Sequence, residues 1–273
     1  MTDLDPRFDS AIDIAAPPSV KKEPSVKKDL LGNENFPWDS FDSDAYFENN
    51  YSKLRGDDEQ IIDIVADFFQ RNEIPRRLRP RAIDVGAGAN LYPALTMLPF
   101  AAELHLVERA FTNREWLATE ILGPHPSWSQ FWDHMKDGRR SYESIRHPFD
   151  LLGRRKNIVK GNIFSLPGAT YDMGTMFFVA ESITTRGSEF VRATRSFVNS
   201  LVPRAPFAAA FMRDSSGYRV GARDFPACAV DEGDVLLALH AVATDVQIHT
   251  VDSWDLRDGY HGMIVATGRK KPA

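Results

Sequence analysis

The chain has 273 residues, of which 43% are hydrophobic and 26% are charged, and its formal net charge at pH 7 is −5. This composition is typical of globular proteins and excludes a fully disordered or fibrous chain. Because acidic side chains outnumber basic ones, we expect no nucleic-acid partner and no membrane attachment. The chain has no apolar run of spanning length and no signal-peptide pattern at its start. Its single cysteine, Cys228, cannot form an intramolecular disulfide, which predicts a cytoplasmic protein.

The first stretch of the chain predicts a disordered tail. Residues 1–35 are poor in aromatic side chains and contain the repeat Pro-Ser-Val-Lys-Lys at 18–22 and again at 24–28. Such a segment buries too little apolar surface to fold by itself. We therefore assign residues 1–35 to the tail and residues 36–273 to one folded domain.

Two helices are predicted at the start of this domain, within residues 36–75. A short helix covers 46–51 and is capped by Asp42, Ser43 or Asp44. A longer helix follows, capped near Asp57 or Asp58, and carries an apolar stripe at helical spacing. The stripe consists of Ile61, Ile62, Ile64, Val65, Phe68 and Phe69.

From residue 76 onward, apolar strands alternate with helical segments. The predicted strands are 82–85, 104–107, 157–160, 172–179, 207–212, 246–251 and 262–267. The predicted helices lie at 91–100, from 112, at 186–201 and at 235–239, with a hairpin at 220–230 and an insertion at 124–156 that is helical around Trp128 and Trp132. This order predicts an α/β fold with a mostly parallel seven-stranded sheet that is covered on both faces. The last two strands have no helix between them, which predicts one antiparallel edge strand.

The first strand-to-helix turn is the most informative place in the sequence. Gly86 and Gly88 follow the first strand and allow a ligand to approach the backbone closely. Glu108 ends the second strand, and its carboxylate can accept hydrogen bonds from two ribose hydroxyls. Together these features predict a nucleoside site. The third glycine of a dinucleotide motif is replaced by Leu91 and no basic residue lies near the turn, which favours S-adenosylmethionine over NAD.

Four stretches of the chain carry a family resemblance. They are Ala-Tyr-Phe-Glu-Asn-Asn-Tyr at 45–51, Ile-Asp-Val-Gly-Ala-Gly-Ala-Asn-Leu-Tyr at 83–92, the segment 108–113, and Ser-Gly-Tyr-Arg-Val-Gly at 216–221 leading to Phe225. Over residues 41–270 the chain resembles the nicotinamide, phenylethanolamine and thioether methyltransferases, which are class I S-adenosylmethionine enzymes. The resemblance implies a Rossmann-like core with an N-terminal helical lid and a lid hairpin after the fifth strand.

The resemblance also implies a set of cofactor-binding residues. These are Tyr46, Tyr51, Gly86, Gly88, Asn90, Tyr92, Glu108, Asn113, Asn162, Ile163 and Phe177. The two tyrosines of the first motif would contact the methionine part of the cofactor, and the Asn162 carbonyl would accept a hydrogen bond from the adenine amino group. Phe177 stands where relatives have a small residue.

The acceptor side departs from the family pattern. Phe211 stands where the amine methyltransferases of the family have an acidic residue, so neither nicotinamide nor phenylethanolamine is implied as the substrate. The expected substrate pocket consists of Tyr46, Phe178, Phe211, Arg213 and Tyr218. Candidate catalytic residues are Glu181, Asp214 and Tyr46, where a carboxylate could take the proton of an amine. The seven histidines show no ligand spacing, so we expect no metal.

These observations predict an S-adenosylmethionine-dependent methyltransferase that acts on a small molecule, with an amine nitrogen favoured over oxygen or sulfur, in a setting such as specialised metabolism. The transfer would be direct and in line. The alternatives are a cofactor-binding protein without transfer activity, an enzyme that cyclises the cofactor itself, and an NAD-linked oxidoreductase. We expect a monomer or a weak homodimer.

Overall fold

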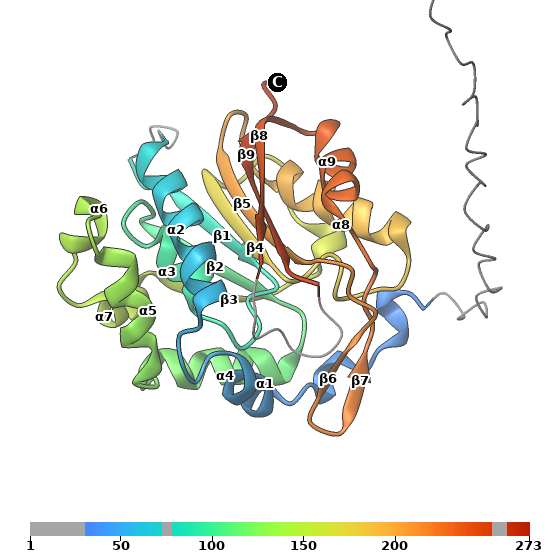
Figure 1. Ribbon diagram of the computed structural model, residues 1–273. Helices are drawn as coiled ribbons and strands as arrows, with labels where there is room; N and C mark the ends of the chain where they lie inside the picture. Colours follow the sequence, from blue (N-terminus) through green and yellow to red (C-terminus); the bar gives the residue numbers. More distant parts are fainter. Residues whose placement is uncertain (1–30, 73–77, 253–260) are drawn as a thin grey trace, which may run out of the picture. The chain divides into compact units, whose positions relative to one another are not determined.

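A computed structural model describes residues 31–72, 78–252 and 261–273 (Figure 1). Its central sheet has seven strands in the order β3-β2-β1-β4-β5-β9-β8. The strands are β1 (Arg81–Val85), β2 (Glu103–Glu108), β3 (Lys156–Lys160), β4 (Met173–Phe177), β5 (Pro206–Met212), β8 (Ala243–Val251) and β9 (Met263–Lys270). Strands β1 to β5 are parallel, and β9 pairs antiparallel with β5 on one side and with β8 on the other. The predicted mostly parallel seven-stranded sheet with an antiparallel edge is confirmed.

Helices cover both faces of this sheet (Figure 1). One face packs against α8 (Gly187–Ser200) and α9 (Glu232–His240). The other face packs against α2 (Gly56–Arg71), α3 (Tyr92–Met97) and α4 (Phe111–Leu122). Because strand side chains alternate between faces, β5 sends Phe207, Ala209 and Phe211 to the α8 side. Ala208, Ala210 and Met212 go to the α2 side.

The insertion at 124–156 is helical and belongs to the core. It forms α5 (Ser127–Lys136), α6 (Arg140–Glu143) and α7 (Pro148–Arg155). Trp128 and Phe131 are fully buried, and the Trp128 ring lies 5.6 Å from that of Phe47 and 6.0 Å from that of Tyr51. The insertion therefore braces the N-terminal segment, which the sequence did not indicate.

The described part of the N-terminal segment begins earlier than predicted. Residues 33–35, assigned from the sequence to the tail, form the short helix η1 (Asn33–Asn35), and the Asn33 backbone N–H donates to the Glu189 carboxylate at 2.9 Å. Asn33 is 5% exposed. The boundary at residue 35 is therefore wrong, because residues before it make fixed polar contacts. The rest of the predicted tail, residues 1–30, lies outside the described residues.

The two predicted N-terminal helices form, with one correction. Helix α1 (Ser43–Asn50) is capped by Asp42, whose side chain accepts from the Ala45 N–H at 3.0 Å. Helix α2 begins at Gly56, and its N-terminal flanking residue is Arg55. Asp57 and Asp58 therefore lie inside the first turn and are both buried at 4% exposure, so neither is the predicted cap.

The hairpin after β5 packs against the N-terminal segment. It consists of β6 (Tyr218–Val220) and β7 (Arg223–Phe225), so it starts two residues earlier than predicted and is shorter. The Phe225 ring lies 5.5 Å from that of Trp38, in η2 (Trp38–Ser40), and 5.1 Å from that of Phe41. We call residues 31–50 together with this hairpin the lid.

Residues 31–72, 78–252 and 261–273 contain neither a membrane-spanning helix nor a cluster of metal ligands. No helix there is long and apolar enough to cross a membrane. No group of three or more histidine, cysteine, aspartate and glutamate side chains there could hold a metal ion.

Candidate functional site

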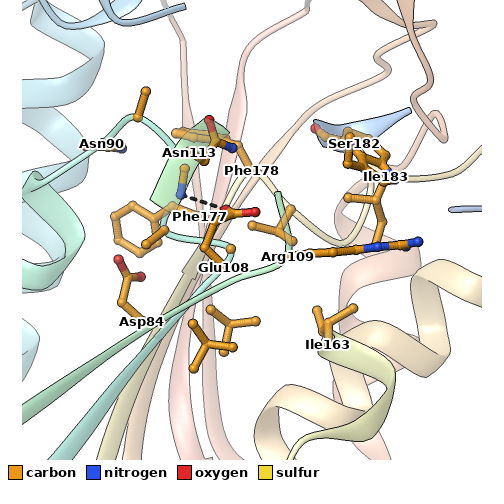
Figure 2. Close-up of a pocket in the computed structure, with 18 of the residues that line it drawn as sticks. Asp84, Asn90, Glu108, Arg109, Asn113, Ile163, Phe177, Phe178, Ser182 and Ile183 are labelled. Atoms are coloured by element: carbon orange, nitrogen blue, oxygen red, sulfur yellow. Dashed lines mark hydrogen bonds between the residues drawn. The ribbon is translucent and has the colours of Figure 1, made fainter. Parts of the chain in front are cut away.

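A pocket opens at the carboxyl ends of β1, β2 and β4, beneath the lid (Figure 2). Ligands of open parallel sheets bind at this end of the strands. Many of the residues singled out from the sequence line it, although they come from remote parts of the chain. They are Tyr46, Tyr51, Gly86, Gly88, Asn90, Glu108, Asn113, Asn162, Ile163, Phe177, Phe178 and Tyr218.

The glycine turn after β1 forms part of the pocket wall. Gly86 has φ 67° and Gly88 has φ 54°, which is the left-handed region that other residues rarely adopt. A Cβ atom on Gly86 would lie 2.6 Å from Val179 Cγ2, whereas one on Gly88 would meet its nearest atom, the Gly86 carbonyl oxygen, at 3.6 Å. Gly86 is therefore required by both backbone conformation and space, and Gly88 by conformation alone.

The Glu108 carboxylate holds this turn in place. One oxygen accepts from the Gly88 N–H at 3.0 Å (Figure 2), and the other accepts from the Ala110 N–H at 2.7 Å. Burial raises the pKa of Glu108, while the N–H groups of Ala110 and Gly88 act in the opposite direction. Since each carboxylate oxygen has two lone pairs, both can accept a further hydrogen bond from a ligand.

Asp84, on β1, is a site residue that the sequence analysis did not select. Its Oδ1 accepts from Thr175 Oγ1 at 2.7 Å, and its Oδ2 is buried without a hydrogen-bond partner among the described residues. Burial raises the pKa of Asp84 to about 7, and the nearby Glu108 carboxylate contributes to the same shift. The sequence did contain an indication of this role. An aspartate between Ile83 and Val85 in a buried strand is costly to bury, which points to a functional contact.

Three asparagines of the pocket also hold local structure. Asn90 Oδ1 accepts from the Tyr92 N–H at 3.0 Å, and Asn162 Oδ1 accepts from the Phe164 N–H at 3.0 Å. Asn113 Oδ1 accepts from Ser43 Oγ at 2.7 Å and so ties α4 to α1. The Asn162 oxygen, which was expected to accept a hydrogen bond from the adenine amino group, thus already accepts one from the backbone.

Several lining residues were missed because their signals were weak. Asn33, Trp38, Phe41, Arg109, Ser182 and Ile183 also line the pocket. Arg109 corrects the expectation that no basic residue lies near the turn. It follows Glu108 directly, and nothing in the sequence indicated that it faces the same space as the glycines.

Two predicted aromatic site residues lie outside the pocket. Tyr92 is fully buried beneath it, with its ring 5.6 Å from that of Phe131 and 5.6 Å from that of Phe177. Phe211 is fully buried on the opposite face of the sheet, 5.7 Å from the ring of Phe190. The reason for the second error is alternation along β5, because a shift of one residue moves a side chain to the other face.

The charged candidates after β4 and β5 also lie outside the pocket lining. Arg213 forms an ion pair with Glu232 at 3.2 Å, and Asp214 is half-exposed with φ 51°. Glu181 is fully buried and accepts from the Met212 N–H at 3.0 Å and from Ser182 Oγ at 3.1 Å. Burial raises the pKa of Glu181 to about 7. Its carboxylate is buried and is not among the groups that line the pocket.

A smaller second pocket shares a wall with the first. Its lining consists of Tyr46, Tyr51, Asp57, Asp58, Phe178, Ser182, Met212, Tyr218 and Met263. Met212 thus occupies the position on β5 that Phe211 was expected to fill. Phe178, which lines both pockets, has φ 58°, a strained conformation for an aromatic residue and one that tends to persist at functional sites.

Comparison with solved structures returns methyltransferases. A protein from Methanosarcina mazei described as an S-adenosylmethionine-dependent methyltransferase matches with a TM-score of 0.51 at 11% identity, over 72% of this chain and 95% of that one. The 1,6-didemethyltoxoflavin N1-methyltransferase of Burkholderia thailandensis, solved with its substrate and S-adenosylhomocysteine, has a TM-score of 0.49 at 16% identity over 84% of both chains. The N-methyltransferase NodS of Bradyrhizobium japonicum has a TM-score of 0.47 at 11% identity, over 85% of this chain and 93% of that one.

The similarity to the Methanosarcina protein and the strand order define the fold. The chain has the Rossmann-like fold of class I methyltransferases, as predicted. No protein-family model and no curated protein matches the chain. The resemblance to the nicotinamide, phenylethanolamine and thioether methyltransferases therefore stays a prediction.

Proposed function

We propose that this protein is an S-adenosylmethionine-dependent methyltransferase that acts on the amine nitrogen of a small molecule. The observation that carries the proposal is the pair of carboxylates, Asp84 and Glu108, on either side of the Gly86–Gly88 turn in one pocket. The fold supports it as well, because the Methanosarcina relative of the same fold is described as an S-adenosylmethionine-dependent enzyme.

The residues of the pocket fit this cofactor. The buried Asp84 Oδ2, which has no hydrogen-bond partner among the described residues, suits the ammonium group of the methionine part. The remaining lone pairs of the Glu108 carboxylate suit two ribose hydroxyls. Asn162 and Ile163, which also line the pocket, would accommodate the adenine.

A dinucleotide fits the same residues less well. A dinucleotide fold places a pyrophosphate at the turn after the first strand, where negative charge would meet both Asp84 and Glu108. Arg109 also lines the pocket, so it is these carboxylates and Leu91 that disfavour a dinucleotide, not a lack of basic side chains.

When bound, S-adenosylmethionine supplies a methyl group already activated by a positively charged sulfur. The chain then has to hold the acceptor nitrogen in line with that group and to exclude water. Tyr46, Tyr51 and Phe178 line both pockets and would position the acceptor against the cofactor. The lid would exclude water.

Calorimetry with S-adenosylhomocysteine and S-adenosylmethionine tests the cofactor. We expect a dissociation constant of about 1–100 µM for each, equivalent to about 5.5–8 kcal/mol, and no binding of NAD. If the folded protein binds neither sulfur compound, the proposal fails.

A product screen tests the reaction. We expect S-adenosylhomocysteine to form with members of an amine panel and not with matched phenols or thiols. Formation of methylthioadenosine would indicate cyclisation of the cofactor instead. Cofactor binding without turnover of any panel member would indicate a binding protein.

We also propose a small-molecule acceptor and a cytoplasmic enzyme that is a monomer or a weak homodimer. The net charge of −5 and the single cysteine support this setting. Size-exclusion chromatography with light scattering measures the oligomeric state.

A further inference from the structure

The second pocket contains two carboxylates that no part of the family resemblance assigns. We propose that Asp57 and Asp58 bind the amine of the methyl acceptor as an ammonium ion inside an aromatic-walled pocket. One of the two carboxylates then takes a proton from this ion, and the freed nitrogen lone pair can attack the methyl group. This inference rests on the proposed function, since it concerns the acceptor side of the same site. The two aspartates would take the role of the acidic residue that amine methyltransferases of the family carry on the fifth strand. In this chain Phe211 stands at that position and lies on the other face of the sheet.

The position of the two aspartates is the first argument. Asp57 and Asp58 lie in the first turn of α2, and both are 4% exposed although they line a cavity. Their neighbour Glu59, in the same turn, is exposed. Charged side chains are rarely buried. The carboxylate of Asp58 interacts with the buried Tyr92, so the burial of Asp57 beside it is the stronger sign of a ligand.

The surroundings favour a cation. Among the described residues, the lining of this pocket has two carboxylates and no lysine, arginine or histidine. Asp57 Oδ1 accepts from the Asp58 backbone N–H at 2.9 Å. Both carboxylates lie in the first turn of α2, at the positive end of its macrodipole. An anionic ligand such as a carboxylate or a phenolate would be repelled here.

The remaining walls suit an organic ammonium ion. Tyr46 and Tyr51 stand edge to face with ring centroids 6.0 Å apart, and Phe178 and Tyr218 complete the aromatic lining. Aromatic faces attract cations, and Met212 and Met263 offer apolar surface for the rest of the ligand. The cavity itself measures about 20 Å³, which is room for an ammonium group or one water molecule, so the apolar body of the ligand has to extend toward the first pocket.

The shared wall connects this cation site with the proposed cofactor site. Tyr46, Tyr51 and Phe178 belong to both pockets, so an amine held by the aspartates lies next to the first pocket and not on a separate surface. The structure thus assigns the acceptor a positive charge and a compact apolar body.

The test uses the full chain and two matched ligand pairs: benzylamine with benzyl alcohol, and phenethylamine with phenethyl alcohol. Dissociation constants are measured by ligand-observed NMR, with and without saturating S-adenosylhomocysteine. We expect at least one amine to bind about tenfold more tightly than its alcohol. Equal binding within both pairs would overturn the inference, and this comparison needs no variant.

Variants locate the site. Asp57→Asn should weaken amine binding about tenfold, while Glu59→Gln, the exposed acid of the same helix turn, should leave it unchanged. Asp57→Asn should keep the S-adenosylhomocysteine affinity of the parent within about twofold, which also shows that the variant is folded. Loss of S-adenosylhomocysteine binding in folded Asp57→Asn would place the carboxylate in the cofactor site and overturn the inference. A parent protein that binds no S-adenosylhomocysteine would instead refute the proposed function.

Discussion

Asp84 and Glu108 are neighbouring buried carboxylates that differ in what satisfies them. Each oxygen of Glu108 accepts a backbone N–H, whereas one oxygen of Asp84 has no hydrogen-bond partner among the described residues. Burying an unsatisfied carboxylate costs free energy, and a ligand cation can recover part of that cost. Substitutions at the two positions should therefore have different effects on folding and on binding.

Asp84→Asn should make the free protein more stable and the ligand weaker. The amide can still accept from Thr175 Oγ1 and carries no charge to desolvate. Thermal unfolding at pH 8 should show an increase in Tm of about 5 °C. Calorimetry should show S-adenosylhomocysteine binding weakened at least about tenfold. An unstable variant that binds as tightly as the parent would contradict the role given to Asp84.

The stability difference between Asp84→Asn and the parent should depend on pH. The folded-state pKa of Asp84 is raised to about 7 from the ordinary 3.8. Between these values the unfolded chain releases a proton that the folded protein keeps, so the parent loses stability as the pH rises from about 4 to about 7. The gain in Tm of Asp84→Asn should therefore be small at pH 4 and reach its full size above pH 7. Glu181, whose pKa is also raised to about 7, is present in both proteins and cancels in the comparison.

Glu108→Gln should mainly affect binding. The glutamine carbonyl can accept one of the two backbone N–H groups that the carboxylate now holds, but the charge is lost. A hydrogen bond to a charged group contributes about 1.5–3 kcal/mol, so S-adenosylhomocysteine affinity should fall about 10- to 150-fold in calorimetry. An unchanged affinity would mean that Glu108 only supports the turn.

The two glycines of the turn offer a matched pair for stability. Gly88→Ala should cost about 1–2 kcal/mol, because only the left-handed backbone conformation opposes it. Gly86→Ala adds a contact of 2.6 Å with Val179 Cγ2 and should cost about 1–3 kcal/mol more. Urea unfolding of the two variants measures both, and equal losses would show that Val179 can move aside.

At the scale of elements, the lid depends on contacts between two segments far apart in the chain. The segment 31–50 meets the β6–β7 hairpin through Trp38, Phe41 and Phe225. The helical part of this segment is polar, as in Glu48-Asn49-Asn50, so these aromatic contacts are its main apolar connection to the hairpin.

Phe225→Ala should loosen the lid without unfolding the core. In the parent, residues 36–50 should gain hydrogen-exchange protection when S-adenosylhomocysteine binds. In Phe225→Ala this gain should be reduced, because aromatic pairs contribute about 0.5–1.5 kcal/mol each beyond their buried area. Arg223→Ala, at an exposed position of the same strand, serves as the control. Equal protection in both variants would show that the hairpin does not hold the segment.

The sequence predicts the bounds of a strand well where an apolar run ends at a glycine. It predicts less well which side chain faces the site where two apolar residues are adjacent in a strand. The run 82–85 stops at Gly86, which defined both the strand and the turn. In β5, Phe211 and Met212 are both apolar, so alternation alone did not tell which one faces the site. Asp57 reads as a helix cap in sequence, and only the packing of α2 against the pocket shows that it is turned inward.

At the scale of the whole molecule, the described residues from Leu31 to Ala273 form one compact unit. Its N-terminal end is held by the Leu31 N–H, which donates to Thr185 Oγ1 at 2.8 Å, and by the Asn33 N–H on Glu189. Asn33 also lines the first pocket.

Two truncations therefore form a decisive pair. Removal of residues 1–30 should leave S-adenosylhomocysteine affinity within about twofold of the parent, a difference of about 0.4 kcal/mol. Removal of residues 1–35 takes away Asn33 and the bonds to Glu189 and Thr185, and should weaken binding about tenfold. If the shorter truncation already abolishes binding, the domain boundary at residue 31 is wrong.

The composite lid has a consequence for timing. We expect a ligand beneath it to leave when the segment 31–50 separates from the hairpin. Its residence time should then follow the rate of that separation more than the strength of the contacts in the pocket. Lid motions of this kind occur in microseconds to milliseconds and often limit product release. In stopped-flow experiments, Phe225→Ala should then release S-adenosylhomocysteine faster while capturing it at nearly the parental rate. If turnover of the parent protein is slow, separation of Phe225 from Trp38 and Phe41 would be the limiting step. Weakening these aromatic contacts would speed release of the bound ligand but would also admit water to the pocket.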